Sequence, residues 1–183
     1  MSFGWSVDIG FRNLCVVLFK KSEQNFTVLH VSLTRFEAHP RKQSVKFKRD
    51  FTDFIKHLLN THAAILKEHG TNKLARVFVE AQVRVNRLAR SVSATLSSIL
   101  RQQNGVCLHL PEVERVAANV KRKLYSEHDK KRLLPGLKHK PLRKAHAQKT
   151  FIDNVPTHAK DQFKKFKQLH DVADATLQAL ASL

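Results

Sequence analysis

Apolar residues follow two different periods along this chain of 183 residues. In its first part, short runs of β-branched and aromatic residues are separated by polar connections, which predicts strands over 4–9, 14–19 and 25–33. Because these connections are short, we expect the three strands to form an antiparallel meander. Gly10 lies in the first connection, where it permits a tight turn and a close approach of the backbone.

The rest of the chain alternates between helical and extended patterns. A nearly continuous apolar run over 74–80 predicts a central strand covered on both faces, and a second run predicts a strand over 105–110. Apolar residues spaced three and four apart predict helices over 47–66, 84–103, 111–124, 142–154 and 163–180. This order predicts an α/β fold with a five-stranded mixed sheet, whose last two strands run parallel to the first.

The composition is that of one domain spanning 1–183, with 42% hydrophobic residues to form its core. Lys and Arg number 33 against 15 Asp and Glu, which gives a formal net charge of +18. Such a charge attracts polyanions at long range. Nucleic acid is therefore the expected partner, and its binding should weaken as salt rises.

Other features bear on the compartment. No apolar run approaches the roughly 18 to 20 residues that cross a bilayer, and the first residues lack the regions of a signal peptide. Cys15 and Cys107 each lie in an apolar run, which favours two buried thiols over a disulfide. We therefore expect no membrane partner and an intracellular, reducing location: the cytoplasm, the nucleus or the mitochondrial matrix. No transit segment is evident, which argues against a mitochondrial precursor.

Basic residues gather in two places. Arg84, Arg87 and Arg90 crowd the start of the helix predicted over 84–103, where the helix dipole disfavours cations, so an anionic partner is expected there. A second group lies between 120 and 149, where Pro and Gly residues predict a basic, mobile loop around 125–141. This loop either solubilises the chain or contacts phosphates, and its density of like charge favours phosphates. The candidates for nucleic-acid contact in this second group are Lys121, Arg122, Lys123, Arg143, Lys144 and Lys149.

Four acids stand in apolar surroundings. Asp8 lies in the first strand, Glu80 ends the strand over 74–80, and Asp171 and Asp174 are spaced to share one side of the last helix. A carboxylate in apolar company needs a cation or a donor. If the four converge, their oxygen ligands suit magnesium or manganese better than zinc. Two such ions, roughly 3.5 to 4 Å apart, promote in-line hydrolysis of a phosphodiester.

Each acid also has an ordinary structural interpretation. Asp8 matches a turn residue in a D-x-G sequence, and Glu80 is placed to pair with Arg84. Asp171 and Asp174 could balance nearby lysines. The order of two strand acids followed by a helical acid pair is harder to explain in this way.

Three segments together resemble a known family. They are Ser6-Val-Asp-Ile-Gly-Phe-Arg-Asn13, Glu80-Ala-Gln82-Val-Arg84 and His170-Asp-Val-Ala-Asp-Ala175. Their order and spacing look like those of RuvC-like Holliday junction resolvases, nearest to the branch of poxviruses and fungal mitochondria. The resemblance implies a ribonuclease H-like fold with helices on both faces of the sheet. It further implies a homodimer that resolves four-way DNA junctions by paired nicking, with two Mg²⁺ ions per active site, for which Mn²⁺ substitutes, and no small-molecule cofactor.

The resemblance also implies roles for single residues. Asp8, Glu80, Asp171 and Asp174 correspond to catalytic metal ligands, and Gln82 and Arg84 to positions facing the junction strands. Lys121 and Lys144 are the candidates for the family's basic active-site residue, of which Lys144 is taken as catalytic. His170 precedes the acid pair, where it either contacts the metal or caps and packs the helix. Two functions compete with this one: a nuclease of RNA–DNA hybrids or flaps, and a non-catalytic protein that binds branched nucleic acid.

Overall fold

The protein, described by a computed structural model, contains one five-stranded sheet with the strand order β3-β2-β1-β4-β5. The structure describes residues 1–9, 13–23, 25–35, 45–81, 87–117, 120–124, 145, 148–149 and 169–183. The strands are β1 (Ser2–Ile9), β2 (Asn13–Lys21), β3 (Phe26–Arg35), β4 (Arg76–Ala81) and β5 (Val113–Ala117). The helices within these described residues are α1 (Val45–Glu68), α2 (Arg87–Gln103), the 3₁₀ helix η1 (Val120–Leu124) and α6 (Leu169–Ser182).

The predicted mixed sheet is confirmed. β1 pairs with β2 and β2 with β3 in antiparallel fashion, so the first three strands form the expected meander. β4 pairs in parallel with β1, and β5 in parallel with β4. The change from short turns to helical crossovers therefore occurs after β3, where the sequence pattern places it.

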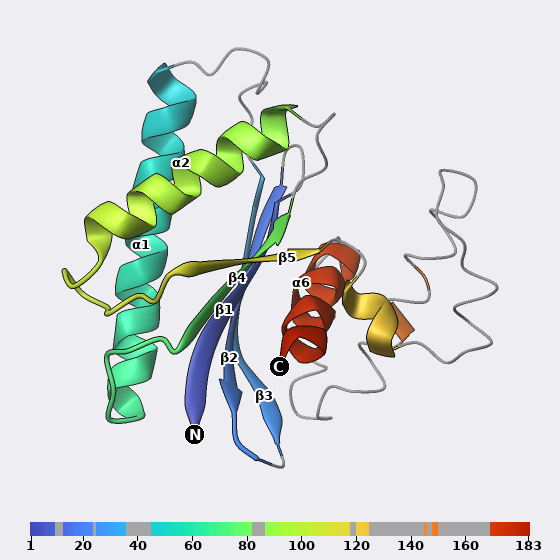
Figure 1. Cartoon of the computed structure of the whole chain (residues 1–183). Helices are drawn as coiled ribbons and strands as arrows, with labels where there is room; N and C mark the ends of the chain where they lie inside the picture. Colours follow the sequence, from blue (N-terminus) through green and yellow to red (C-terminus); the bar gives the residue numbers. More distant parts are fainter. Residues whose placement is uncertain are drawn as a thin grey trace.

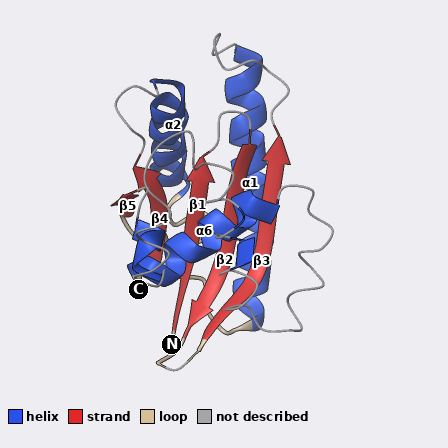
Figure 2. Cartoon of the chain, turned by 90° about the vertical axis from the view of Figure 1, so that its right-hand side faces the viewer, coloured by secondary structure: helices blue, strands red, loops and turns tan. Residues whose placement is uncertain are grey.

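Helices cover both faces of the sheet. α1 and α2 lie against one face and α6 against the other (Figures 1 and 2). The larger core fills the space beneath α1 and α2 and includes Trp5, Val7 and Ile9 of β1. A smaller core lies beneath α6, where Cys15 and Val17 of β2 pack with apolar residues of that helix. Since side chains alternate along a strand, Ser6 and Asp8 fall on the α6 face of β1.

α1 ends where the sequence predicts it. The apolar positions spaced three and four apart, among them Phe51, Ile55, Leu58 and Leu59, are buried against the sheet. Gly70 follows the helix with a φ of 70°, in the left-handed region that glycine enters without steric cost. The chain then turns directly into the approach to β4.

The prediction for residues 105–124 is wrong in two respects. The fifth strand is β5, not 105–110, and the helix predicted over 111–124 is reduced to η1. Gly105 adopts a φ of 81°, and the Asn104 side chain accepts a hydrogen bond from the Leu110 N–H at 2.7 Å, so this segment forms a turn. Residues 113–117 are extended because their backbone pairs with β4, which outweighs their helical pattern.

The remaining predictions for the second half are covered only in part. α2 begins at Arg87, and residues 82–86 lie outside the described part of the chain. Of the helix predicted over 142–154, the described residues Ala145, Gln148 and Lys149 are helical, whereas the loop around 125–141 is outside the description. α6 overlaps the last predicted helix and extends two residues beyond its predicted end at 180. The single-domain organisation stays a prediction.

The two cysteines differ in their exposure. Both cysteines are free, but only Cys15 is buried. Cys107 was expected to be buried and is partly exposed, because the segment that carries it is a turn rather than a strand.

Among the described helices, none is both long and apolar enough to span a bilayer.

Candidate active site

Two of the predicted site acids end neighbouring parallel strands. Val7 of β1 is paired with Val79 of β4, and Asp8 and Glu80 are the next residues on these strands. Both acids are half-buried. Glu80 lies on the α6 face, since Phe78, two residues earlier, packs with Ala179 of α6. β1 and β4 are therefore neighbours, and the two acids share one face of the sheet.

The other two acids come from the helix that covers this face. Asp171 and Asp174 are half-buried near the start of α6, whereas Val172, Ala173 and Ala175 are buried against the sheet. Asp171 lies in the first turn, where the helix dipole favours an anionic side chain. The dipole gives Asp171 a structural reason to be present, which is compatible with a role in a site.

Several carboxylates lie close enough to the Cys15 thiol to affect its pKa. Cys15 is paired with Asp8 across β1 and β2 and is 1% exposed. Burial raises the pKa of the Cys15 thiol well above its usual value, and the charges of Asp8, Asp171 and Asp174 raise it further. Three acids from two distant segments therefore act on the same buried thiol.

Asn13 connects the two layers. It is the first residue of β2, and its Nδ2 donates a hydrogen bond to Oδ2 of Asp171 at 3.2 Å. Its other side-chain polar atom, Oδ1, is buried and has no hydrogen-bond partner among the described residues. A buried acceptor of this kind is unusual, because most buried polar groups in proteins are paired.

The donor set fits a hard divalent cation in its chemistry. Carboxylate oxygens are the ligands that Mg²⁺ and Mn²⁺ prefer, and the four acids share one face of the sheet with a buried amide oxygen. Within the described residues, however, no three His, Cys, Asp or Glu side chains form a group that could hold a metal ion. The acids therefore occupy one region without forming a preassembled metal cluster.

The predicted nucleic-acid contacts are distributed over several elements. Arg87 is the first residue of α2, and Arg90 is exposed one turn later. Lys121 and Arg122 belong to η1, as does Lys123, whose side chain is exposed. Lys149 is exposed. Gln82, Arg84, Arg143 and Lys144 lie outside the described residues, and His170 is in the first turn of α6.

Two residues near the acids were missed by reasoning from the sequence. The motif that contains Asn13 gives this residue no role of its own, and the strand predicted over 25–33 ends before Arg35. Arg35 is paired with Asn13 across β2 and β3 and is exposed. Directly opposite residues of an antiparallel pair project from the same face, so Arg35 adds a cation beside the acids. The longer reach of β3 could have been recognised from the alternation of Val31, Leu33 and Arg35.

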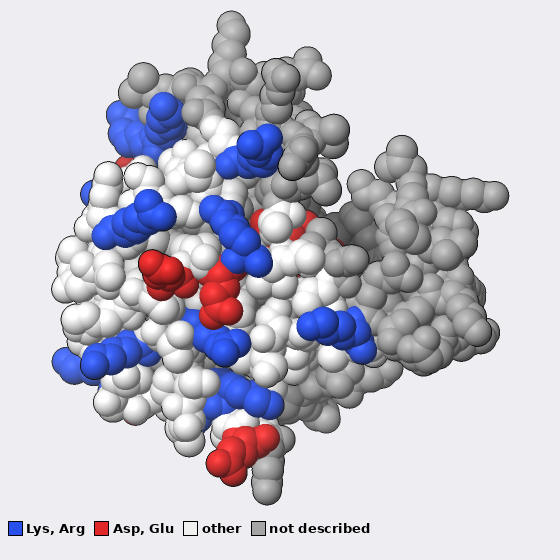
Figure 3. All heavy atoms as spheres, in the orientation of Figure 1, with Lys and Arg blue, Asp and Glu red and all other residues white. Residues whose placement is uncertain are grey.

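Lys and Arg side chains are scattered over the described part of the face in Figure 3, with a few Asp and Glu side chains among them. The two exposed ion pairs described, Arg49 with Asp50 and Arg76 with Glu114, have N···O distances of 3.9 and 3.8 Å. Such exposed pairs contribute little stability.

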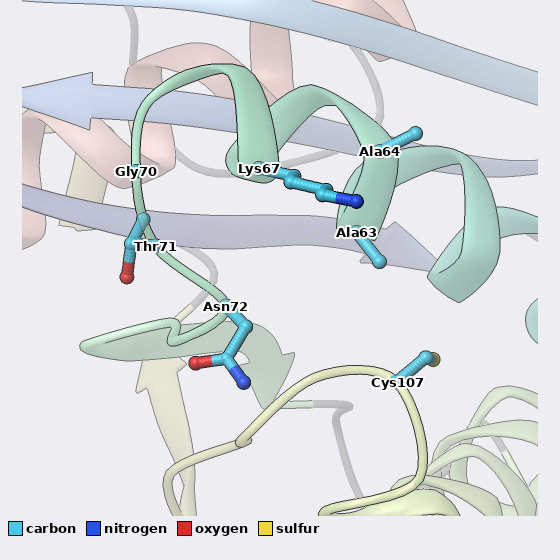
Figure 4. A pocket seen from close by; sticks show the side chains of 7 residues that line it. All are labelled: Ala63, Ala64, Lys67, Gly70, Thr71, Asn72 and Cys107. Carbon is cyan, nitrogen blue, oxygen red and sulfur yellow. The ribbon is translucent and has the colours of Figure 1, made fainter.

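Two cavities lined by described residues lie away from the acids. One of about 500 Å³ is bordered by the end of α1 and the turn at Cys107, with Thr71 and Asn72 on its wall (Figure 4). Another of about 450 Å³ lies between α2 and the start of β5. Both adjoin the start of a parallel strand, whereas Asp8 and Glu80 are at the ends of β1 and β4. Neither cavity belongs to the acidic site.

Comparisons with known proteins agree on the fold. The chain is similar to Fowlpox virus resolvase in its complex with substrate Holliday junction DNA, with a TM-score of 0.56 and 12% identity over 98% of this chain and 95% of that one. It is also similar to T. thermophilus RuvC in complex with a Holliday junction substrate, with a TM-score of 0.55 and 14% identity over 98% of this chain and 91% of that one. No protein-family model matches the chain, and no curated protein matches its sequence.

Proposed function

Since the chain has the ribonuclease H-like fold of the RuvC-like Holliday junction resolvases, we propose that it is a structure-selective DNA endonuclease that resolves four-way junctions. One observation carries this proposal beyond the fold: Asp8, Asp171 and Asp174 act on one buried thiol, and Glu80 is beside Asp8 on the neighbouring strand. A basic protein with an acidic region suits the hydrolysis of nucleic acid.

In this proposal Asp8, Glu80, Asp171 and Asp174 hold divalent cations, Mg²⁺ or Mn²⁺. Bound by these carboxylates, two such cations would supply the chemistry of in-line hydrolysis: activation of a water and stabilisation of the leaving oxygen. The strands fix the positions of Asp8 and Glu80, because each follows directly on a paired residue. α6 brings Asp171 and Asp174 over the same strand ends. The protein's own contribution is to place these oxygens on a rigid sheet and to keep them half-buried.

The basic residues hold the DNA. Arg35 is beside the acids, and Arg90, Lys123 and Lys149 are exposed on other elements. A junction is recognised by its shape, so we expect most contacts to be made with phosphates, which Lys and Arg provide without reading sequence. Lys144 and Lys121 remain the proposed basic residues of the active site.

Paired nicking requires two active sites on one junction, so we propose a homodimer. Light scattering of the protein, alone and with junction DNA, tests this part of the proposal. A monomeric mass in the presence of junction DNA would contradict it, since one site cannot cut two strands at once.

A digest of three substrates side by side tests the function. Four-way junction, RNA–DNA hybrid and flap DNA are each incubated with the protein in Mg²⁺ and in EDTA. We expect symmetric nicks in the junction with Mg²⁺ and no cleavage in EDTA. Preferred cleavage of the hybrid or the flap would mean that the protein is a ribonuclease H-like nuclease with that substrate and not a junction resolvase. Binding of the junction without cleavage in either Mg²⁺ or Mn²⁺ would make the protein a non-catalytic binder.

A further inference from the structure

Asn13 projects toward the acids from the first position of β2. Cys15 and Val17, two and four residues later, pack in the core beneath α6. Because side chains alternate along a strand, Asn13 is on the same face. Its hydrogen bond to Asp171 agrees with this placement and joins residues that are 158 positions apart in sequence.

The hydrogen bond fixes which way the amide faces. Nδ2 must be the atom turned toward Oδ2 of Asp171, because the reverse orientation would bring two oxygens together. Oδ1 therefore points elsewhere, and this buried oxygen has no partner in the part of the chain that the structure describes. An acceptor that is buried beside carboxylates and unpaired with any described residue is suited to a ligand that donates or is positively charged.

The neutral charge of the amide also matters. A Lys or Arg at this position would form an ion pair with Asp171 and compete with a cation for the carboxylate. An amide orients the carboxylate by a hydrogen bond and leaves its charge in place. Groups that orient metal ligands in this way are common in metal sites.

We propose that Asn13 is a positioning residue of the cation site. This inference rests on the proposed function. Its Nδ2 holds Asp171 in the orientation that receives the cation, and its Oδ1 accepts a hydrogen bond from water that accompanies the cation. Mg²⁺, when bound to a protein, usually keeps several waters, and the same is proposed for Mn²⁺ at this site. A neutral acceptor beside the carboxylates can accept a hydrogen bond from such a water, which an apolar side chain cannot do.

Binding of Mn²⁺ to the full chain without DNA tests the proposal. Asn13→Leu has a similar shape and lacks both polar atoms, and Asn104→Leu is the matched control, since Asn104 makes a hydrogen bond far from the acids. By calorimetry we expect the Kd for Mn²⁺ to rise about tenfold or more in Asn13→Leu and to stay within twofold of the wild type in Asn104→Leu. Raised Mn²⁺ should restore nicking by Asn13→Leu.

A second variant distinguishes a loss of metal binding from a loss of folding. Asn13→Asp loses the donor and adds a negative charge beside Asp171, so we expect a lower Tm without metal and a larger rise in Tm with Mn²⁺ than in the wild type. A structural role alone would lower the Tm of both variants and leave the Mn²⁺ affinity unchanged.

The outcomes separate this inference from the proposed function. An unchanged Kd for Mn²⁺ in Asn13→Leu, with a wild type that nicks junctions, overturns the role of Asn13 alone. A wild type that binds Mn²⁺ through Asn13 but cuts no branched DNA overturns the function and supports the site. A wild type that binds no Mn²⁺ overturns the inference.

Discussion

Asp8 is directly opposite Cys15 in the antiparallel pair of β1 and β2, so the carboxylate and the buried thiol share the α6 face. The charges of Asp171 and Asp174 also raise the pKa of the thiol. The face beneath the start of α6 thus combines low exposure with several anionic groups. This combination is costly for a protein unless cations or donors offset it.

Replacing Asp8 by Asn should abolish cleavage and preserve binding. The amide keeps the shape of the side chain but removes the charge that a divalent cation requires. We expect nicking of a four-way junction to fall by more than about a hundredfold, beyond the effect of losing an orienting group. Gel-shift assays in Ca²⁺ should show junction affinity within a few-fold of the wild type. Asp50→Asn, on the exposed surface of α1, is the control. Cleavage by Asp8→Asn at the normal rate in Mg²⁺ would refute the metal site.

Arg35 should contribute one phosphate contact beside the acids. Because each phosphate contact releases counterions, the logarithm of the binding constant falls linearly with the logarithm of the salt concentration. We expect Arg35→Gln to weaken junction binding and to reduce the magnitude of this slope by about one. Lys67→Gln serves as the control, since Lys67 is exposed in the last turn of α1. Equal slopes for the wild type and Arg35→Gln would mean that Arg35 contacts no phosphate of the bound DNA.

His62 should make the protein less stable in acid. It is fully buried, its Nε2 is 2.8 Å from Nδ1 of His30, and burial, with a smaller contribution from His30, lowers its pKa from 6.5 to about 3. Between about pH 3 and pH 6.5, His62 is protonated in the unfolded chain but not in the folded chain. The free energy of unfolding should therefore fall as pH drops from 6.5 toward 3, by up to about 1.4 kcal/mol per pH unit from this residue.

Comparison with His62→Phe isolates this contribution. The phenyl ring retains a ring edge against Trp5, whose ring centroid is 5.2 Å from that of His62, and it does not titrate. Denaturant unfolding between pH 7 and pH 4 should show a shallower decline for the variant. Parallel declines in the two proteins would show that His62 is protonated equally in both states.

Gly4 should tolerate no larger residue. A Cβ at this position would meet the ring of Phe19 and would be 2.9 Å from the carbonyl oxygen of Arg76, since Gly4 is paired with both β2 and β4. We expect Gly4→Ala to lower the free energy of unfolding by about 1 to 3 kcal/mol through overpacking. Adding Phe19→Leu removes the nearest ring atoms, so the double variant should lose less stability than the sum of the single ones. Additive losses would mean that the Phe19 ring is not the obstacle.

The sequence predicts most of the elements because their patterns are strong. The alternation in β1 and the spacing of apolar residues in α1 leave little choice of structure. β5 was misplaced because Pro111 and the residues after it resemble the start of a helix, and only pairing with β4 makes 113–117 extended. A pattern within one segment does not contain that information.

The acids could be named from the sequence, whereas their supporting groups could not. Asp8 and Glu80 are conspicuous as charges within apolar strands. The contact of Asn13 with Asp171 depends on how α6 docks on β2, and the position of Arg35 depends on the register of β2 and β3. Both are properties of the assembled structure.

The separation of Asn13 and Asp171 along the chain bears on how the protein folds. β1, β2 and β3 meet through short connections, so their pairing requires little loop closure, whereas the hydrogen bond between β2 and α6 spans 158 positions. Contacts of such separation carry a larger entropic cost and slow the search for the native state. In a refolding experiment the meander should acquire hydrogen-exchange protection first, and competence to cut DNA should be the last property to return.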